Sequence, residues 1–222
     1  MLNLIMKDIV IQKKNLLFAF AYTIFLSIVF SSLKPSGLGL YVMGPIVTVY
    51  MLISYAVNYD DKNKSEIVFN SLPIRRDEIV ISKYISTFVF LIIGISYSIL
   101  IGFIEKITGA PLINRPVSLL DIGLVLPSVC IVASIFFPVY FKFGAIKMRI
   151  FTNIMLVLIV FLPVNVIIYA NKNPNNILVQ GFNHFMNNTS SFTLNSLAII
   201  VGLIIFLLSL IISIRIYNNK EL

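Results

Sequence analysis

Residues that carry chemistry are scarce in this chain. It has one cysteine, one histidine and no tryptophan, and it has nine Asp and Glu residues against 17 Lys and Arg residues. A single cysteine, Cys130, excludes an intramolecular disulfide and a thiolate metal cluster, so we expect it to be a packing residue. The sequence lacks His-Glu-x-x-His, Gly-x-Ser-x-Gly and Gly-x-x-x-x-Gly-Lys-Ser/Thr. We therefore expect no enzyme activity, no metal, no bound cofactor and no nucleotide-binding domain.

Apolar stretches fill most of the remaining sequence. Hydrophobic residues make up 59% and charged residues 12%, with a mean hydropathy of +0.98. Six stretches without Asp or Glu each approach the roughly 20 residues that cross a bilayer as a helix. Backbone groups in hydrocarbon must pair within their own segment, which favours helices. The sequence predicts an all-α integral membrane protein with one transmembrane domain over 1–222 and spans at 16–33, 38–57, 84–104, 122–141, 150–170 and 194–214.

The cations predict the orientation of these spans. Lys and Arg in short loops are retained on the cytoplasmic side. With both termini inside, the outer side receives only Lys34, Lys106, Arg115 and Lys172 of the 17 cations. We expect a multi-pass protein of the cytoplasmic membrane with cytoplasmic termini. The net charge of +8 then lies beside anionic lipid headgroups, and nucleic acid is not an expected partner.

Small residues form stripes along two of the predicted spans. Membrane helices pack where small side chains let their backbones approach closely. The first span carries such residues every fourth position, and the third span repeats the pattern. These faces are expected to pack within the bundle or between two copies of it; they are Ala19, Thr23, Ser27, Ser31, Gly94, Ser98 and Gly102.

The N-terminal segment 2–14 precedes the first span. Leu2, Ile5, Met6 and Ile9 recur at helical spacing. This predicts a helix lying in the cytoplasmic interface, although a frayed extension of the first span has the same pattern. Cleavage as a signal peptide is disfavoured by the length of the apolar run and the lack of a small-x-small site.

The polar stretch from Asn58 to Lys83 is predicted to be cytoplasmic. Asn63 and Glu66 form a capping-box pattern and Pro73 ends the segment, so 64–71 is predicted to be a short helix. Arg76 to Lys83 restarts as a helix feeding the third span. A short helix with apolar side chains outside the membrane is marginal alone, which favours a docking partner over folding back onto the membrane surface.

The outer loop 171–193 has an apolar middle at 177–186 that is too short to span. It is either a re-entrant outer segment or an ordinary surface loop. His184 within it is expected to be solvated or hydrogen-bonded. Glu105 and Asp121, at the outer ends of their spans, are expected to pair with Lys106 or Arg115.

No ionisable group is expected at membrane depth, where proton relays and ion-coupled carriers need one. The bundle is therefore predicted to be chemically inert. Energy for uphill transport would have to come from another polypeptide through the exposed 64–71 helix.

The phrase Glu66-Ile-Val-Phe-Asn-Ser-Leu-Pro-Ile-Arg-Arg-Asp-Glu-Ile-Val-Ile-Ser-Lys-Tyr84, with six spans and an N-terminal interfacial helix, resembles permease subunits of type-2 ATP-binding-cassette (ABC) exporters. Within that group it is most similar to exporters of phenol-soluble modulins and peptide antibiotics. The resemblance implies two permease subunits, as a homodimer or heterodimer, with two ATPase subunits that bind ATP and Mg²⁺. It also implies an elbow helix at 2–14 and a coupling helix that contacts the ATPase through Asn63, Lys64, Ser65, Glu66, Ile67, Val68, Phe69, Asn70, Ser71, Leu72, Pro73, Arg75 and Arg76.

The expected function is ATP-driven export of an amphipathic or hydrophobic substrate, such as a peptide toxin or antimicrobial peptide, by alternating access. Two alternatives share the topology. One is a non-transport immunity or sensor protein that binds a peptide. The other is a six-helix facilitator or binding subunit for a small molecule. Neither would depend on an ATPase.

Overall fold

The computed structural model describes residues 2–30, 37, 39–63, 65, 75–108, 115–177, 179–181, 184 and 189–220. Within these residues the chain is helical and contains no strand, which confirms the all-α prediction. The helices are α1 (Leu2–Val10), α2 (Lys13–Val29), a π-helical turn η1 (Gly39–Met43), α3 (Gly44–Lys62), α5 (Arg76–Thr108), α6 (Leu119–Lys172) and α8 (Ser191–Asn218).

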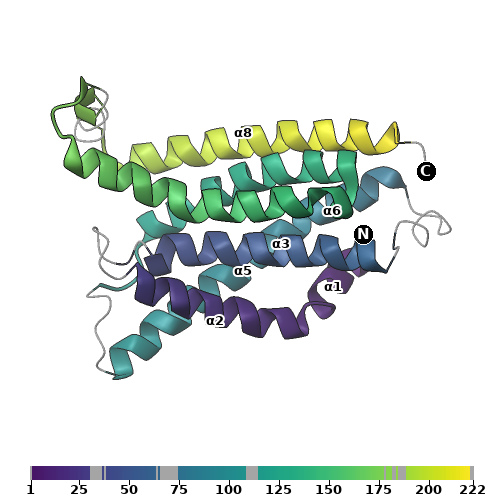
Figure 1. The fold of residues 1–222 in the computed structure, drawn as a ribbon, viewed down its shortest axis with the longest axis horizontal. Coiled ribbons are helices and arrows are strands. Elements are labelled where there is room, and N and C mark those ends of the chain that lie inside the picture. Colours follow the sequence, from purple (N-terminus) through teal and green to yellow (C-terminus); the bar gives the residue numbers. More distant parts are fainter. Residues whose placement is uncertain are drawn as a thin grey trace.

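Five helical segments of the described chain are long and apolar enough to cross a membrane: Gly39–Lys62, Arg76–Ile107, Leu119–Gly144, Ile150–Lys172 and Ser191–Asn218. Asn3–Val10 and Asn15–Val29 together pass the same test but are bent by 64°. The long helices lie side by side, and both termini lie at one end of the bundle (Figure 1). A multi-pass membrane protein is thus supported, while a sixth crossing, the interfacial position of α1 and the side on which the termini lie stay predictions.

The long helix α6 is two spans joined at a break. Gly144 has φ 74° and ψ 166° inside the helical run, a backbone conformation that is essentially restricted to glycine. The chain reverses there, so Leu119–Gly144 and Ile150–Lys172 form an antiparallel pair (Figure 1). This break lies between the fourth and fifth predicted spans.

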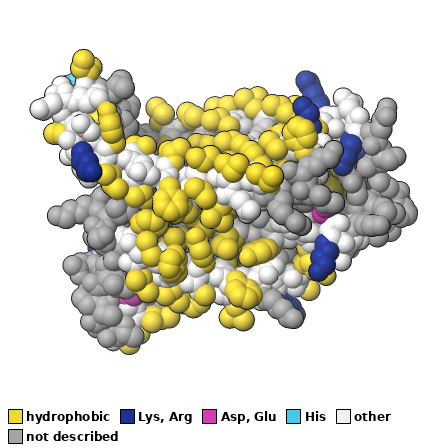
Figure 2. Space-filling view, viewed as in Figure 1, with side chains coloured by type: hydrophobic (Ala, Val, Ile, Leu, Met, Phe, Trp, Pro, Cys, Tyr) yellow, Lys and Arg dark blue, Asp and Glu magenta, His cyan; other side chains and the backbone are white. Residues whose placement is uncertain are grey.

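Helix α3 lies at the centre of the bundle. In its most apolar stretch 78% of the residues are buried, against 22% in α8 and 11% in Ile150–Lys172. Large buried side chains surround it, and the Tyr50 ring lies edge-on to Phe136 with centroids 5.8 Å apart. Hydrophobic side chains cover the middle of the visible outer face, with Lys and Arg toward its ends (Figure 2). That belt has the composition of a lipid-facing surface.

Two helices extend further into the polar stretch 58–83 than the predicted spans. Helix α3 continues to Lys62 and α5 begins at Arg76. The predicted restart of a helix at Arg76 is confirmed. Extension of these helices buries Asp60 and Lys83 in the bundle, although both belong to the stretch predicted to be polar and cytoplasmic.

Candidate functional site

The predicted coupling segment joins α3 to α5 in sequence, and the adjoining ends of these two helices lie at the end of the bundle that holds both termini. Asn63 is exposed and forms the C-cap of α3, its backbone N–H donating to Tyr59 O at 3.1 Å. Ser65 is half-buried and Arg75 is exposed. The predicted contact residues Lys64, Glu66, Ile67, Val68, Phe69, Asn70, Ser71, Leu72 and Pro73 lie outside the described residues. The structure therefore places the two ends of the segment.

The start of α5 contacts the end of α8. Arg76 donates from Nη1 to the carbonyl oxygens of Asn218, at 3.1 Å, and Lys220, at 3.2 Å. Asn218 in turn donates from Nδ2 to Asp77 Oδ1 at 2.8 Å. These bonds attach the second end of the predicted coupling segment to the C-terminal helix. Arg76 is thus placed in a contact within the chain.

Four charged residues meet inside the bundle at the same end, and we call Lys7, Asp8, Asp60 and Lys83 the ionic cluster. Lys83 Nζ donates to Asp8 Oδ1 at 2.8 Å and to Asp60 Oδ2 at 2.5 Å. Lys7 Nζ donates to Asp60 Oδ1 at 2.5 Å and lies 3.6 Å from Asp8 Oδ1. Two lysines and two aspartates thus join three helices, α1, α3 and α5, with formal charges that balance.

The side chains of the ionic cluster are buried, except for that of Lys7, which is partly exposed. Side-chain exposure is 2% for Asp8, 6% for Asp60 and 6% for Lys83, against 27% for Lys7. Ser86 also donates to Asp8 Oδ2, at 3.3 Å. Next to the cluster, Gln12 Nε2 donates to Leu52 O at 2.8 Å, and its buried Oε1 has no hydrogen-bond partner. Asp60 and Lys83 lie just beyond the predicted spans 38–57 and 84–104, so the absence of ionisable groups at membrane depth stays a prediction, while the ends of these helices carry buried charges.

A helical pattern in the sequence could have revealed these charges. Along α3 the buried residues Ile53, Ala56 and Val57 lead directly to Asp60 at spacings of three or four. Lys83 follows buried Ile79 and Val80 in the same way. Residues at these spacings share one helix face, so each charge continues an apolar face that packs into the core. The predicted spans 38–57 and 84–104 exclude these charges, although the buried helix faces continue through them.

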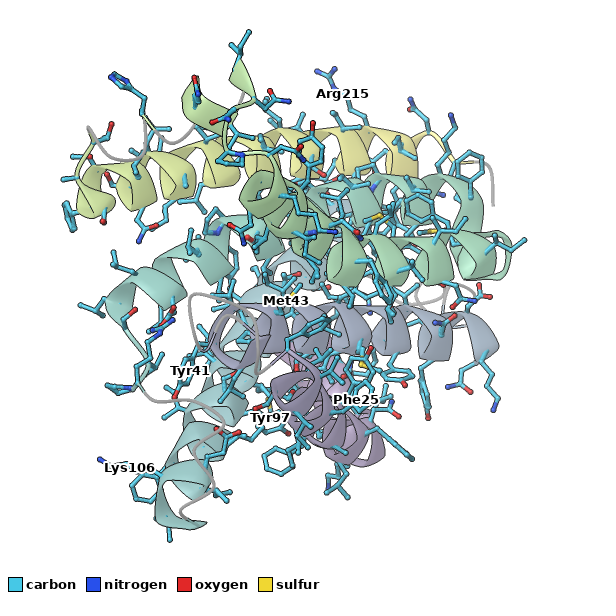
Figure 3. The ribbon with its side chains drawn as sticks, turned by 60° about the vertical axis from the view of Figure 1, so that its left-hand side comes forward. Phe25, Tyr41, Met43, Tyr97, Lys106 and Arg215 are labelled. Carbon is cyan, nitrogen blue, oxygen red and sulfur yellow. The ribbon has the colours of Figure 1, made fainter. Side chains whose placement is uncertain are left out.

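The opposite end of the bundle has separate polar contacts. Arg115 binds Asp121 through two hydrogen bonds, at 2.7 and 2.8 Å, and these raise the pKa of the guanidinium above its ordinary value. Asp121 thus takes one of the partners expected from the sequence. Ser27 Oγ donates to Glu105 Oε1 at 2.7 Å, and Tyr41 OH to Arg115 O at 3.1 Å. Lys106 lies at this end of α5, far from Arg215 on α8 (Figure 3).

The small-residue stripes face neighbouring helices of the same chain. Ala19, Thr23 and Ser27 are buried, and Thr23 Oγ1 lies 2.9 Å from Thr48 Oγ1 on α3. On α5, Ser98 Oγ donates to Leu40 O at 2.8 Å. A Cβ added to Gly94 would lie 3.1 Å from Pro45 O, and one added to Gly102 only 2.5 Å from the Tyr41 hydroxyl oxygen. Ser31 lies outside the described residues.

Two other predicted features have partial descriptions. In the outer segment 177–186 only 177, 179–181 and 184 are described, and Ile177 is 84% exposed. A re-entrant arrangement there stays a prediction. Cys130 is buried, in agreement with the expected packing role. Among the described residues no group of three or more His, Cys, Asp or Glu side chains could hold a metal ion.

A family model described as ABC-2 family transporter protein matches residues 3–218, nearly the whole chain. No curated protein and no solved structure matches the chain.

Proposed function

We propose that this chain, which belongs to the ABC-2 transporter family, exports an amphipathic or hydrophobic substrate across the cytoplasmic membrane. Membership of the family makes it a membrane permease component of an ABC transporter, whose ATPase is a separate subunit. The substrate class we propose is a peptide toxin or an antimicrobial peptide. The resemblance of residues 66–84 to permeases of peptide exporters supports this substrate class.

One structural observation carries this proposal. Helix α3 ends at Lys62 and α5 begins at Arg76, and side-chain contacts attach both of these ends to other helices. Asp60 and Lys83 bond to each other, and Arg76 bonds to the end of α8. A force applied to the segment between them would therefore reach several helices together. We propose that residues 63–73 form the coupling helix that receives this force from the ATPase.

The proposed cycle follows from this attachment. ATP binding draws two ATPase subunits together, they displace the coupling helices, and two permease bundles change the side to which their interface opens. The chain itself supplies no ATP chemistry. ATP and Mg²⁺ are bound by the partner subunits.

The second permease is proposed to be another copy of this chain that packs on the exposed face of Ile150–Lys172. Asn165 is exposed near the middle of this span, and its Nδ2 donates to Phe161 O at 2.8 Å. Polar side chains at membrane depth generally face protein or a water-filled cavity. On α8, by contrast, every exposed residue from Leu197 to Ile212 is aliphatic. An amide is both donor and acceptor, so two copies of Asn165 can pair across a two-fold axis.

The test is to place a charge on the predicted coupling helix. In Phe69→Asp, the apolar side chain that we expect to bind the ATPase is replaced by a charge. We expect loss of ATPase co-purification and of substrate export, with membrane insertion unchanged. The matched control is Ile177→Asp, the same kind of change at the exposed opposite end of the molecule, which should keep both activities. Normal co-purification and export by Phe69→Asp would contradict the proposal.

A further inference from the structure

The ionic cluster is the main polar attachment between the N-terminal helix and the central helices. Asp8 comes from α1, Asp60 from the last turn of α3 and Lys83 from the first third of α5. Asp60 lies three residues before Asn63, and Lys83 lies seven residues after Arg76. The cluster thus includes one residue from each of the two helices that border the proposed coupling segment, each within two turns of the border.

Burial makes this attachment stiff, although not necessarily stabilising. Taking Asp8, Asp60 and Lys83 out of water costs about as much as their attraction returns, so such pairs are poor evidence of stability. Separating them inside the protein, by contrast, leaves uncompensated buried charges and is strongly unfavourable. Displacing the ends of α3 and α5 therefore carries Asp8, and with it α1, along.

Helix α1 is in turn joined to α2. Only Ile11 and Gln12 separate the two helices, and the backbone N–H of Leu16 donates to Gln12 O at 2.9 Å. Gln12 is 1% exposed and its side chain bonds to Leu52 O of α3. Because only two residues join α1 to α2, we expect a movement of α1 to be passed to the first long helix.

We propose that the ionic cluster transmits displacement of the coupling segment through α1 to α2, which makes Asp60 and Lys83 positioning residues for coupled transport. The inference rests on the proposed function, because it assigns a path to the motion that an ATPase would impose. It assigns a functional reason for charges in a place where apolar residues would pack without a desolvation cost.

The experiment measures nucleotide-dependent distances in the complete complex with its ATPase, reconstituted in lipid nanodiscs, in a Cys130→Ala background. One spin-label pair, Lys62→Cys with Leu208→Cys, reports movement at the coupling end of α3. The other, Leu17→Cys with Leu208→Cys, reports movement of α2. These labelled positions are exposed. ATP with vanadate is expected to shift both distances in the complex without cluster substitutions.

The decisive variant combines Asp60→Asn with Lys83→Met, which removes one charge of each sign and leaves Lys7 with Asp8. We expect the α3 distance still to shift and the α2 shift to be reduced, since direct contacts between α2 and α3 such as that of Thr23 with Thr48 remain. The variant should still elute as a folded complex that hydrolyses ATP. Lys83→Arg alone, which keeps the positive charge in an otherwise unaltered cluster, should keep the α2 shift. The matched control, Arg115→Met with Asp121→Asn at the opposite end, should keep both shifts.

The outcomes separate this inference from the proposed function. If the double variant keeps both shifts at full size, the cluster does not transmit the motion and the inference is overturned, while the proposed function stands. If it loses both shifts, the cluster is required for the coupling end itself to move, and the path through α1 is likewise overturned. If no nucleotide-dependent shift occurs in the complex without cluster substitutions, or no ATPase binds, the proposed function fails with it.

Discussion

At the scale of single residues, polar side chains in this bundle are held by specific partners. Tyr84 OH lies 2.8 Å from both Ser209 Oγ and Ser213 Oγ, and Ser209 donates to Ser134 O at 2.8 Å. These contacts join α5, α8 and the first span of α6. In a bilayer the apolar surroundings do not drive helices together, so packing and hydrogen bonds decide how they associate. Tyr84 adds packing to this, since its ring lies 4.6 Å from that of Phe137.

Tyr84→Phe should therefore destabilise the protein modestly. The substitution keeps the ring contacts and removes a hydroxyl that serves two serines. Interhelical hydrogen bonds in membranes contribute about 1 kcal/mol, so we expect a loss of that size in the free energy of unfolding, measured in mixed micelles. Tyr59→Phe, at a position 43% exposed, is the control and should have no measurable effect. Equal effects of the two substitutions would contradict this assignment.

At the scale of elements, the chain uses backbone geometry as well as apolar length to separate its spans. The break at Gly144 has a positive φ, and a Cβ added there would have no neighbour within 4 Å. At Gly202, by contrast, an added Cβ would lie 2.9 Å from Pro127 Cα and Cβ. The first glycine is needed for a turn between helices and the second for close packing of two helices. Gly144 thus separates the two spans of α6, whereas Gly202 lets α8 pack closely against the first of them.

Gly144→Ala and Gly144→Asn should both be destabilising, by about 1 to 3 kcal/mol, because this backbone region is essentially restricted to glycine even where asparagine tolerates other positive-φ conformations. Gly181→Ala, with no atom within 4 Å of the added Cβ, serves as the control. Thermal unfolding followed by size-exclusion would measure the difference. Recovery of stability in Gly144→Asn would indicate an ordinary left-handed turn instead.

At the scale of the whole molecule, burial is distributed unevenly among the long helices. The central span at 39–62 is largely covered by its neighbours, whereas Ile150–Lys172 is covered least. Lipid can cover an aliphatic surface without cost, but it offers no partner to the remaining groups of an exposed amide. The contrast between Asn165 and the aliphatic face of α8 therefore distinguishes two surfaces that both belong to strongly apolar spans.

Cysteine crosslinking in membranes tests the proposed contact between two copies. In a Cys130→Ala background, Asn165→Cys is expected to form a disulfide-linked dimer on mild oxidation, visible as a doubled mass on a non-reducing gel. Leu208→Cys, at a position 56% exposed on α8, should stay monomeric. Crosslinking at 208 and not at 165 would place the interface elsewhere, and absence of any dimer would exclude a second copy at this face.

The sequence by itself determined the class of this protein, because a lack of charge over bilayer-length stretches leaves the helix as the only way to pair the backbone. It also located the break between the fourth and fifth spans and the restart of a helix at Arg76. Family membership and the predicted spans depend on such local patterns. The coupling helix stays a prediction, because the described residues cover only the ends of the segment 63–73. The orientation in the membrane and the substrate also stay predictions.

Only the tertiary structure decided where the charges near the helix ends lie. Asp8, Asp60 and Lys83 are far apart in sequence, and each is of a residue type that is usually exposed to solvent. Their burial depends on helices α3 and α5 extending past the apolar stretch and on α1 folding against them. A charge is buried without a large free-energy cost only when other elements place partners beside it. Those partners are positioned only in the assembled bundle.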